Sequence, residues 1–248
     1  MQVTVNHGWK TYPLPATYLN PVVIAGIPSI FGGQPGVARV NNVTSESFDI
    51  KFQEWRHMDG YHFYEEISVL VLEAGRYEMG DGSVWEAGIT SSIGNRRWAA
   101  YAFSQPFDGV PELLLSHQTS KGADPVTMRS RELTATGFEA AQFEEEALTD
   151  GHLEETVGYL AILSPAGGGV VSTLEGYAPY SLDRIQVNQR WTPLHQWVVR
   201  IQEDQSADVE LRHLYEDMSA LALDGHLFGQ CVTDVEADTF GLRYQLAE

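Results

Sequence analysis

One short segment of the chain concentrates side chains that can bind a small polar ligand. From Glu54 to His62 it contains two aromatic rings, two histidines, an arginine and two carboxylates. A pyranose sugar has apolar C–H faces and a rim of hydroxyl groups, so its site needs an exposed aromatic ring and polar groups at fixed positions. The segment is therefore a candidate sugar site, with Trp55 and Tyr61 as stacking rings. The alternative is that both rings only cover the edge of a sheet.

Residues around this segment recur about ninety positions later. The first set is Arg39, Thr44, Phe48, Glu54, His62 and Glu65, and the second is Arg129, Thr134, Phe138, Glu144, His152 and Glu155. An altered third copy surrounds His213 and Glu216. Internal repetition at a fixed period is typical of tandem units. We expect units at residues 1–94, 95–170 and 171–248, the third a divergent or rearranged copy.

The apolar runs are short, rich in β-branched and aromatic residues, and separated by Gly, Pro, Asn and Asp. This pattern predicts strands at Pro21–Ile27, Val37–Val43, Phe48–Phe52, Ile67–Leu72, Val84–Ile89 and Trp98–Phe103. A hairpin is expected between Tyr77 and Trp85, with Gly80 and Gly82 at positive φ in its turn. The sequence therefore predicts an all-β chain of tandem antiparallel β-sandwich units.

Composition narrows the range of partners. The 248 residues carry a formal net charge of −19, which argues against nucleic acid and anionic membranes as partners. The single cysteine, Cys231, excludes an intrachain disulfide and is expected to be a small apolar residue in a strand. We expect no signal peptide, and no apolar stretch is long enough to span a bilayer. Neutral ligands, cations or a basic protein surface remain as partners.

Two acidic patterns admit more than one interpretation. His-x-x-Glu occurs at His62, His152 and His213, where it could hold a metal ion, contact a ligand, or form a structural tie in which Glu accepts backbone N–H bonds. The run Glu144–Glu146 could bind calcium or form a solvated acidic surface. Asp124 is expected to accept N–H bonds within its own turn. We favour the structural tie and the solvated surface, and expect no metal or cofactor, with calcium as the alternative.

The order of the repeated residues resembles the H-type lectins, a galactose- and N-acetylgalactosamine-binding family. The residues that carry the resemblance are Trp9, Tyr18, Pro21–Ile24, Arg39, Thr44–Phe48 and Gln53–Trp55, then Trp98, Phe107, Pro111–Leu115, Arg129 and Thr134–Phe138. The resemblance implies six-stranded antiparallel β-sandwiches that form trimers and bind sugar in clefts between neighbouring protomers.

The resemblance also implies a set of ligand-binding residues. The sugar-contacting arginine of the family falls at Arg39 and Arg129, and its tryptophan and tyrosine fall at Trp55 and Tyr61. Arg56 occupies the family's histidine position, His57 follows it, and Asp59 adds a carboxylate to the same segment. The second copy has Glu145 at the tryptophan position and Gly151 at the tyrosine position, so it retains the arginine alone.

The sequence thus predicts a lectin-like adhesion protein that recognises a cell-surface glycan by multivalent binding. We expect no enzyme, because nucleophile, metalloprotease and phosphate-loop motifs are missing from the sequence. A homo-oligomer, with a trimer favoured, or a larger assembly is expected, in an extracellular or virion-associated location. The alternative function is a structural component of a virion or phage-like particle, such as a fibre, spike or tail protein.

Overall fold

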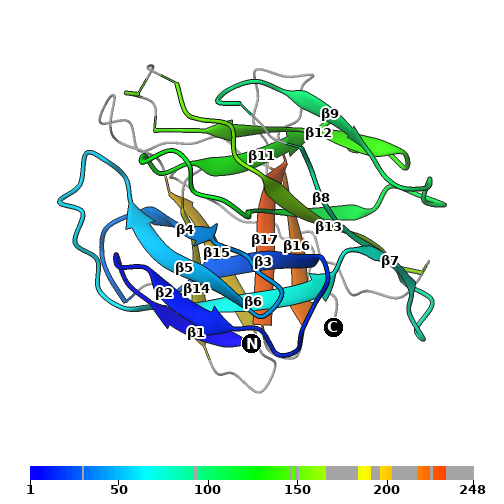
Figure 1. Cartoon of the computed structure of the whole chain (residues 1–248), viewed down its shortest axis with the longest axis horizontal. Coiled ribbons are helices and arrows are strands. Elements are labelled where there is room, and N and C mark those ends of the chain that lie inside the picture. Colours follow the sequence, from blue (N-terminus) through cyan, green and yellow to red (C-terminus); the bar gives the residue numbers. More distant parts are fainter. Residues whose placement is uncertain are drawn as a thin grey trace.

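The structure is a computed structural model that describes residues 1–29, 31–91, 94–145, 147–148 and 151–165, together with the backbone of four later strands. Its strands are β1 (Gln2–Val5), β2 (Lys10–Pro13), β3 (Pro21–Pro28), β4 (Gly36–Asn41), β5 (Ser47–Glu54), β6 (Glu65–Glu73), β7 (Gly75–Glu78), β8 (Val84–Ile89), β9 (Ala99–Ala102), β10 (Glu112–His117), β11 (Thr127–Arg131), β12 (Gly137–Phe143), β13 (Val157–Leu163), β14 (Arg184–Arg190), β15 (Gln196–Gln202), β16 (Asp217–Leu223) and β17 (His226–Val232). No helix occurs in these described parts (Figure 1). The predicted all-β class, built mainly from antiparallel strands, is confirmed.

The strand order of the first six strands recurs in the strands that follow. Two three-stranded sheets have the orders β1-β6-β3 and β2-β5-β4. The orders β8-β13-β10 and β9-β12-β11 occur within the next two sheets. Register recurs as well, since Tyr12 lies opposite Phe48 and Tyr101 lies opposite Phe138.

The expected boundary at residue 94 assigns β7 and β8 to the first unit. Both strands instead belong to the sheet β10-β13-β8-β7, in which β8 pairs with β13. Strand pairing therefore groups residues 75–89 with the second half of the chain. We call β1–β6 the first half and β7–β13 the second half.

The two halves lie one above the other in Figure 1, with β1–β6 in the lower group of strands. Each half has two sheets, and three hydrophobic clusters fill the spaces within and between the halves. One cluster fills the first half between its two sheets, around Phe48, Ile50 and Phe52 of β5. Another fills the second half around Phe138 of β12. The third joins the halves, since Val22, Ile24, Leu114, Leu160 and Ile162 share it with Trp85. The halves are therefore connected by an apolar core as well as by the chain.

Burial along each strand follows from these layers. In β5 buried and half-buried residues alternate, as expected for a strand with one covered face. Strands β3, β10 and β13 are buried almost throughout, because one face meets the core of their own half and the other meets the joining cluster. Gln118 strengthens this junction by accepting a hydrogen bond from the Val23 N–H and donating one to the Val23 carbonyl.

The expected hairpin is present, and its turn corrects one detail. Strands β7 and β8 pair with Tyr77 opposite Trp85. Gly82 has φ of 86°, whereas Gly80 does not adopt positive φ. The Gly82 N–H bonds to the Met79 carbonyl, and Asp81 accepts bonds from Ser83. One left-handed residue therefore closes this turn.

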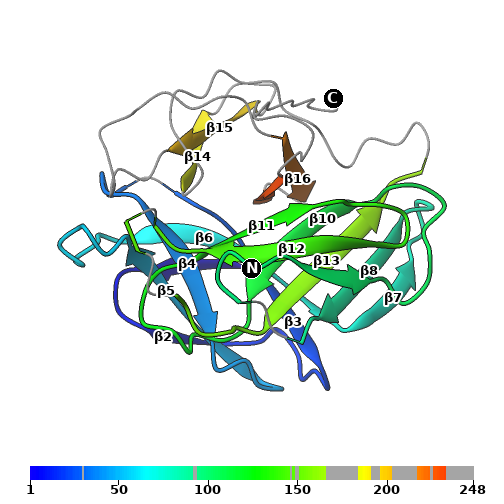
Figure 2. The ribbon, with the colours of Figure 1, turned by 90° about the horizontal axis from the view of Figure 1, so that it is seen from above.

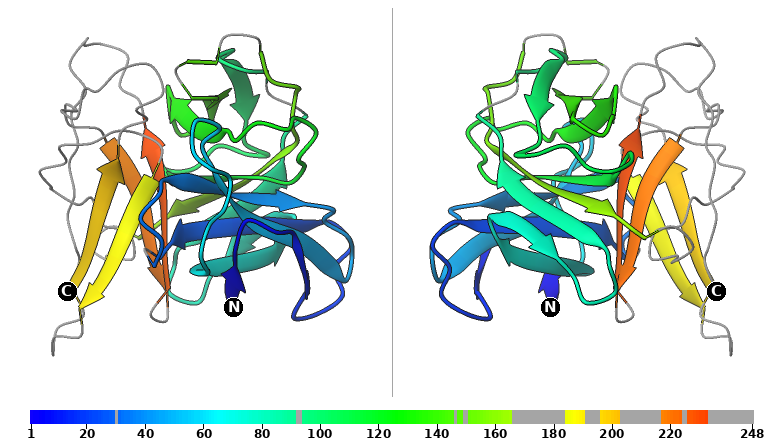
Figure 3. Two further views of the ribbon diagram at one scale, coloured as in Figure 1. Left: turned by 90° about the vertical axis from the view of Figure 1, so that its left-hand side faces the viewer. Right: turned by 90° about the vertical axis from the view of Figure 1, so that its right-hand side faces the viewer.

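The expected third unit, residues 171–248, is described only through the backbones of β14–β17. Strand β17 pairs in parallel with β11, which extends the sheet β16-β17-β11-β12-β9. Strands β14–β17 lie along one side of both halves in Figures 2 and 3. Cys231 lies in β17, as expected. The His213–Glu216 element lies outside the described residues.

We predict that Leu160→Ala destabilises the whole chain, because Leu160 is fully buried in the cluster that joins the halves. A cavity of this kind costs about 3–5 kcal/mol in the free energy of unfolding. Leu153→Ala is the matched control, since Leu153 is 61% exposed, and its cost should stay within about 0.5 kcal/mol. Chemical denaturation measures both. Equal costs would contradict a packed junction.

Candidate functional site

The candidate segment forms a tight loop between β5 and β6. The Met58 N–H bonds to the Trp55 carbonyl at 3.0 Å, and Tyr61 N–H bonds to the Asp59 carboxylate at 2.9 Å. The latter bond is the main reason why the pKa of Asp59 lies below its usual value. Gly60 follows at φ of 74°, a backbone conformation that favours glycine. The loop shape is therefore set by local hydrogen bonds and one glycine.

A buried Glu–His–Glu chain anchors this loop. His62 Nδ1 lies 2.8 Å from Glu54 Oε1, and His62 Nε2 lies 2.8 Å from Glu65 Oε1. Glu65 also accepts bonds from the Ser29 hydroxyl and from the Phe31 and Gly32 N–H groups. Glu54 lies at the start of the loop and His62 at its end, so the bond between them holds the two ends together.

The second half contains the same device. His152 lies 3.0 Å from Glu144 and 3.1 Å from Glu155, again through its two ring nitrogens. Glu155 accepts bonds from the Thr119 hydroxyl and from the Lys121 and Gly122 N–H groups. In each half a glycine, Gly32 or Gly122, leaves room for the imidazole ring where a Cβ would collide with it.

These contacts confirm the structural tie predicted for two of the His-x-x-Glu elements. Burial alone would raise the pKa of Glu65 and Glu155, but the bonds from histidine, hydroxyl and backbone N–H groups outweigh it. The pKa of Glu65 is lowered, and that of Glu155 falls to about 2. In the described residues no cluster of three or more His, Cys, Asp or Glu side chains is arranged to hold a metal ion.

Arg39 ties the two halves together. Its guanidinium is fully buried and lies 3.3 Å from Glu155. It donates bonds to the Asp124 carbonyl at 2.6 Å and to the Ser120 hydroxyl at 2.9 Å. These acceptors hold the loop 119–124 of the second half against the outer face of β4 and β5. Gln53 adds a bond of 2.7 Å to the Ala123 carbonyl.

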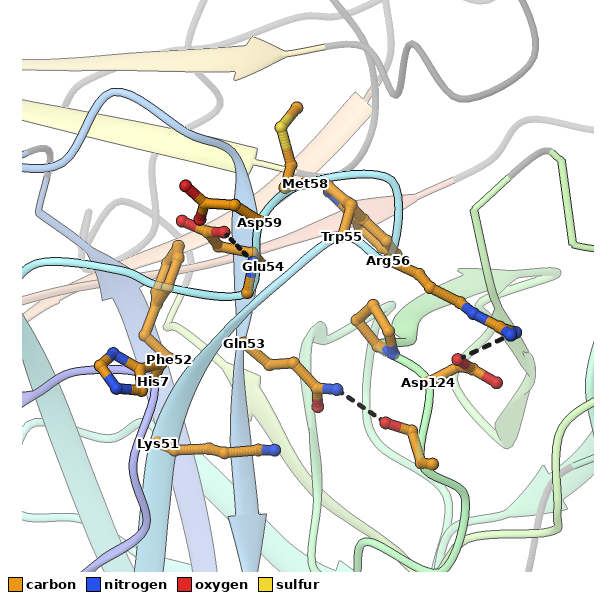
Figure 4. A pocket seen from close by; sticks show the side chains of 13 residues that line it. His7, Lys51, Phe52, Gln53, Glu54, Trp55, Arg56, Met58, Asp59 and Asp124 are labelled. Atoms are coloured by element: carbon orange, nitrogen blue, oxygen red, sulfur yellow. Dashed lines mark hydrogen bonds and ion pairs between the residues drawn. The ribbon is translucent and has the colours of Figure 1, made fainter.

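A pocket opens where this second-half loop meets the candidate segment (Figure 4). Its volume is about 310 Å³, within the range of roughly 300 to 1,000 Å³ seen for small-molecule sites. The first half contributes His7 and residues 51–56 and 58–60, and the second half contributes residues 123–125. In Figure 4 the Arg56 and Asp124 side chains meet across one side of the pocket, at 3.5 Å.

The pocket gathers some of the predicted ligand-binding residues. Trp55, Arg56 and Asp59 line it. The expectation of an exposed ring at Trp55 is wrong, because the side chain is fully buried. Arg56 and Asp59 are exposed and available to a ligand. Their sugar-contacting roles stay predictions.

The other predicted residues lie outside the pocket lining. Tyr61 is 63% exposed and packs its ring 4.5 Å from that of His7, a lining residue. His57 lies 3.6 Å from Glu145. Arg39 is buried between the halves, which removes it from contact with a ligand in this chain. Arg129 is half-buried in the second half, with its guanidinium 4.5 Å above the Phe143 ring.

Two expectations about acidic residues are corrected. Glu144 and Glu145 are buried instead of forming a solvated surface. Glu144 contacts His152, and Glu145 accepts the Arg56 N–H at 2.5 Å. Asp124, expected to accept bonds within its own turn, contacts the Arg56 guanidinium instead. In each case the partner is distant in the sequence, so local pattern could not reveal it.

Sequence reasoning missed several lining residues. Asp124 and Pro125 come from the other half, so no local motif connects them with the candidate segment. Lys51 was also missed, although a signal exists, because the repeat places Ala141 at the equivalent position. A charged residue where the other copy has alanine indicates a role that the shared framework does not require.

We predict that Glu155→Gln strongly destabilises the chain, because it leaves Arg39 buried without its carboxylate partner. Breaking one side of a buried ion pair costs about 3–5 kcal/mol in unfolding free energy. Glu139→Gln is the matched control, since Glu139 pairs with Arg131 at a partly exposed site, and it should cost at most about 1 kcal/mol. Urea denaturation at neutral pH compares the two. If Glu155→Gln lowered the unfolding free energy by less than Glu139→Gln, the Arg39–Glu155 pair would not be what holds the halves together.

Acid is predicted to destabilise the fold in two overlapping windows. Burial, followed by repulsion from Arg39, lowers the pKa of His117 from 6.5 to about 3. The unfolded chain therefore binds this proton first, and stability falls as pH drops from 6.5 towards 3. Glu155 stabilises the fold fully above pH 4.5, and its contribution is lost as pH drops from 4.5 towards about 2.

Denaturation midpoints measured across this range test the prediction. His117→Asn should flatten the dependence between pH 6.5 and 4.5, the window where His117 acts without Glu155. A wild-type stability that stays constant over that window would refute the assignment to His117.

Comparison with known proteins adds one relative. Over 165 residues, 62% of the chain, it is 30% identical to Halomucin from Haloquadratum walsbyi. The chain spans about 2% of the length of Halomucin. No protein-family profile and no solved structure matches the chain. Within the described residues, no helix is long and apolar enough to cross a membrane.

Proposed function

We propose that the chain is a non-catalytic, lectin-like adhesion protein that binds a glycan of the galactose or N-acetylgalactosamine type. The observation that carries the proposal is the pocket between residues 51–60 and 123–125. Its walls present polar groups at fixed positions, because they stand on strand β5 and on two loops that hydrogen bonds hold. A sugar requires this kind of fixed polar rim.

The chemistry of the lining supports a hydroxyl-rich ligand. Arg56 offers several N–H donors, and Asp59 offers carboxylate oxygens, with both side chains exposed at the rim. His7 provides a half-buried ring on the opposite wall, backed by Tyr61. We therefore place the stacking surface at His7 and Tyr61 instead of Trp55.

The fold supports the proposal in a second way. The H-type resemblance implies six-stranded sandwiches, and strands β1–β6 form two three-stranded sheets around one core. We propose that each half is one lectin-like unit. The cleft that the family forms between protomers has a counterpart here within one chain. A trimer, which would multiply such sites, stays a prediction.

Similarity to Halomucin supports an extracellular or cell-surface location. It also favours a second candidate function, a structural module of a large extracellular protein, because the similar segment is a very small part of a long chain. The virion setting expected from the sequence stays a prediction.

We predict that Arg56→Ala and Asp59→Ala each weaken sugar binding by about tenfold or more, since each removes a charged hydrogen-bonding group. Arg97→Ala is the matched control, an exposed arginine outside the pocket lining, and should bind as the wild type does. A glycan array followed by titration calorimetry with galactose and N-acetylgalactosamine measures the effect. If the wild type binds no glycan on the array, the lectin proposal fails and the structural candidate is left.

A further inference from the structure

Among the residues that the structure describes, no ionic partner contacts the pocket cation Lys51. Its ammonium lies 4.8 Å from the centre of the Trp9 ring, and the residue lines the pocket. Within the described residues, no hydrogen bond or ion pair reaches Lys51 Nζ. The chain has a net charge of −19 and only three lysines, Lys10, Lys51 and Lys121. An unpaired lysine beside a pocket is unusual in so acidic a chain.

The position of Lys51 is also electrostatically unfavourable. Lys51 lies directly opposite Arg39 in the β4–β5 pair, and like charges at such positions destabilise a sheet. Burial and the Arg39 guanidinium lower the pKa of Lys51. Glu155 already pairs with Arg39. A second anion beside Lys51 would relieve this repulsion.

The second half shows that the framework does not need this lysine. There the equivalent pair is Arg129 opposite Ala141. The ring equivalent to Trp9 is Trp98, and Arg131 covers it at 4.3 Å. The sheet therefore forms with alanine at the position of Lys51. The lysine is specific to the half that contributes most of the pocket.

The acidic side chains around the pocket already have donors. Both oxygens of Glu54 are bonded, one to His62 and one to the Gly60 N–H. Asp59 accepts the Tyr61 N–H, and Asp124 contacts Arg56. Two further donors of the lining have no hydrogen-bond partner among the described residues. One is Lys51 Nζ, and the other is Trp55 Nε1, which is buried and has no hydrogen-bond partner.

We propose that this pocket selects saccharides that bear an anionic oxygen group, a carboxylate or a sulfate ester, and that Lys51 binds this group. The inference rests on the proposed sugar-binding function and narrows its ligand. It departs from the neutral or cationic partners expected from the net charge, because Lys51 places a local positive charge at the pocket. Lys51 Nζ donates charge-assisted hydrogen bonds to the anion, and the sugar hydroxyls contact Arg56 and Asp59 at the rim. Figure 4 shows Lys51 and Gln53 extending from β5 towards the same side of the pocket.

The test compares sugars that differ in one group. Galacturonate and galactose differ only in the carboxylate at C6, and galactose 6-sulfate supplies the sulfate form. Titration calorimetry should show both anionic sugars binding about tenfold or more tightly than galactose, as expected for a charged hydrogen bond. The preference should shrink as sodium chloride rises, because salt screens partly exposed charges.

Lys51→Met removes the charge and retains a long apolar side chain. We expect it to abolish the preference for both anionic sugars over galactose. Lys10→Met is the matched control, because Lys10 also lies over an exposed ring, that of Tyr64, but does not line the pocket. The Lys51 variant should unfold at the same temperature as the wild type or higher, since it removes a like-charge pair.

The outcomes separate the two proposals. Equal binding of galactose, galacturonate and galactose 6-sulfate would overturn the anionic preference and leave the sugar-binding function standing. An anionic preference that survives in Lys51→Met would remove Lys51 from the site. Binding of no sugar would overturn both proposals. Preference for only one anionic sugar, lost in Lys51→Met, would support the inference and identify the anionic group.

Discussion

The Arg39–Glu155 ion pair controls how the two halves of the chain fit together. A buried guanidinium is costly unless its hydrogen bonds and charge are satisfied. The two terminal nitrogens of Arg39 bond mainly to the second half, through Glu155, the Ser120 hydroxyl and the Asp124 carbonyl, whereas its Nε has no hydrogen-bond partner among the described residues. Glu155 is in turn held by His152 and by the loop that it caps. The loop 119–124 therefore stays over β4 and β5, and the wall that it forms turns an open sheet surface into a pocket.

The sequence predicted the features that depend on local pattern. Alternation at Phe48, Ile50 and Phe52 predicted β5, and the ninety-residue period anticipated the repeated His-x-x-Glu ties. Features that depend on distant partners were not predicted. Trp55 looked like an exposed ring, and Glu145 looked like a solvated acid, because nothing nearby in the sequence shows what covers them. The pocket could not be predicted for the same reason, since residues 123–125 are more than sixty positions from residues 51–60 of the other wall.

The repeat separates framework from specialised positions. His62 and His152 have equivalent partners, which fits a demand of the fold that both halves share. Trp55 and Glu145 occupy equivalent positions with unlike side chains, and Glu145 accepts a bond from the loop that carries Trp55. The second copy thus supports the loop of the first. Divergence between copies has produced one half that contributes most of the pocket and another that completes it.

The cluster that joins the halves affects how the chain could engage an extended ligand. Strands β3, β10 and β13 are covered on both faces, so separating the halves would expose a large apolar surface to water. The halves are therefore not modules on a flexible tether, whose reach a linker would set. One contact point on each half would therefore be held at a fixed separation from the other. An extended ligand could bind at both contact points only if its own repeat distance matched that separation. The rigid stacking of the sheets would therefore select ligands by their repeat distance.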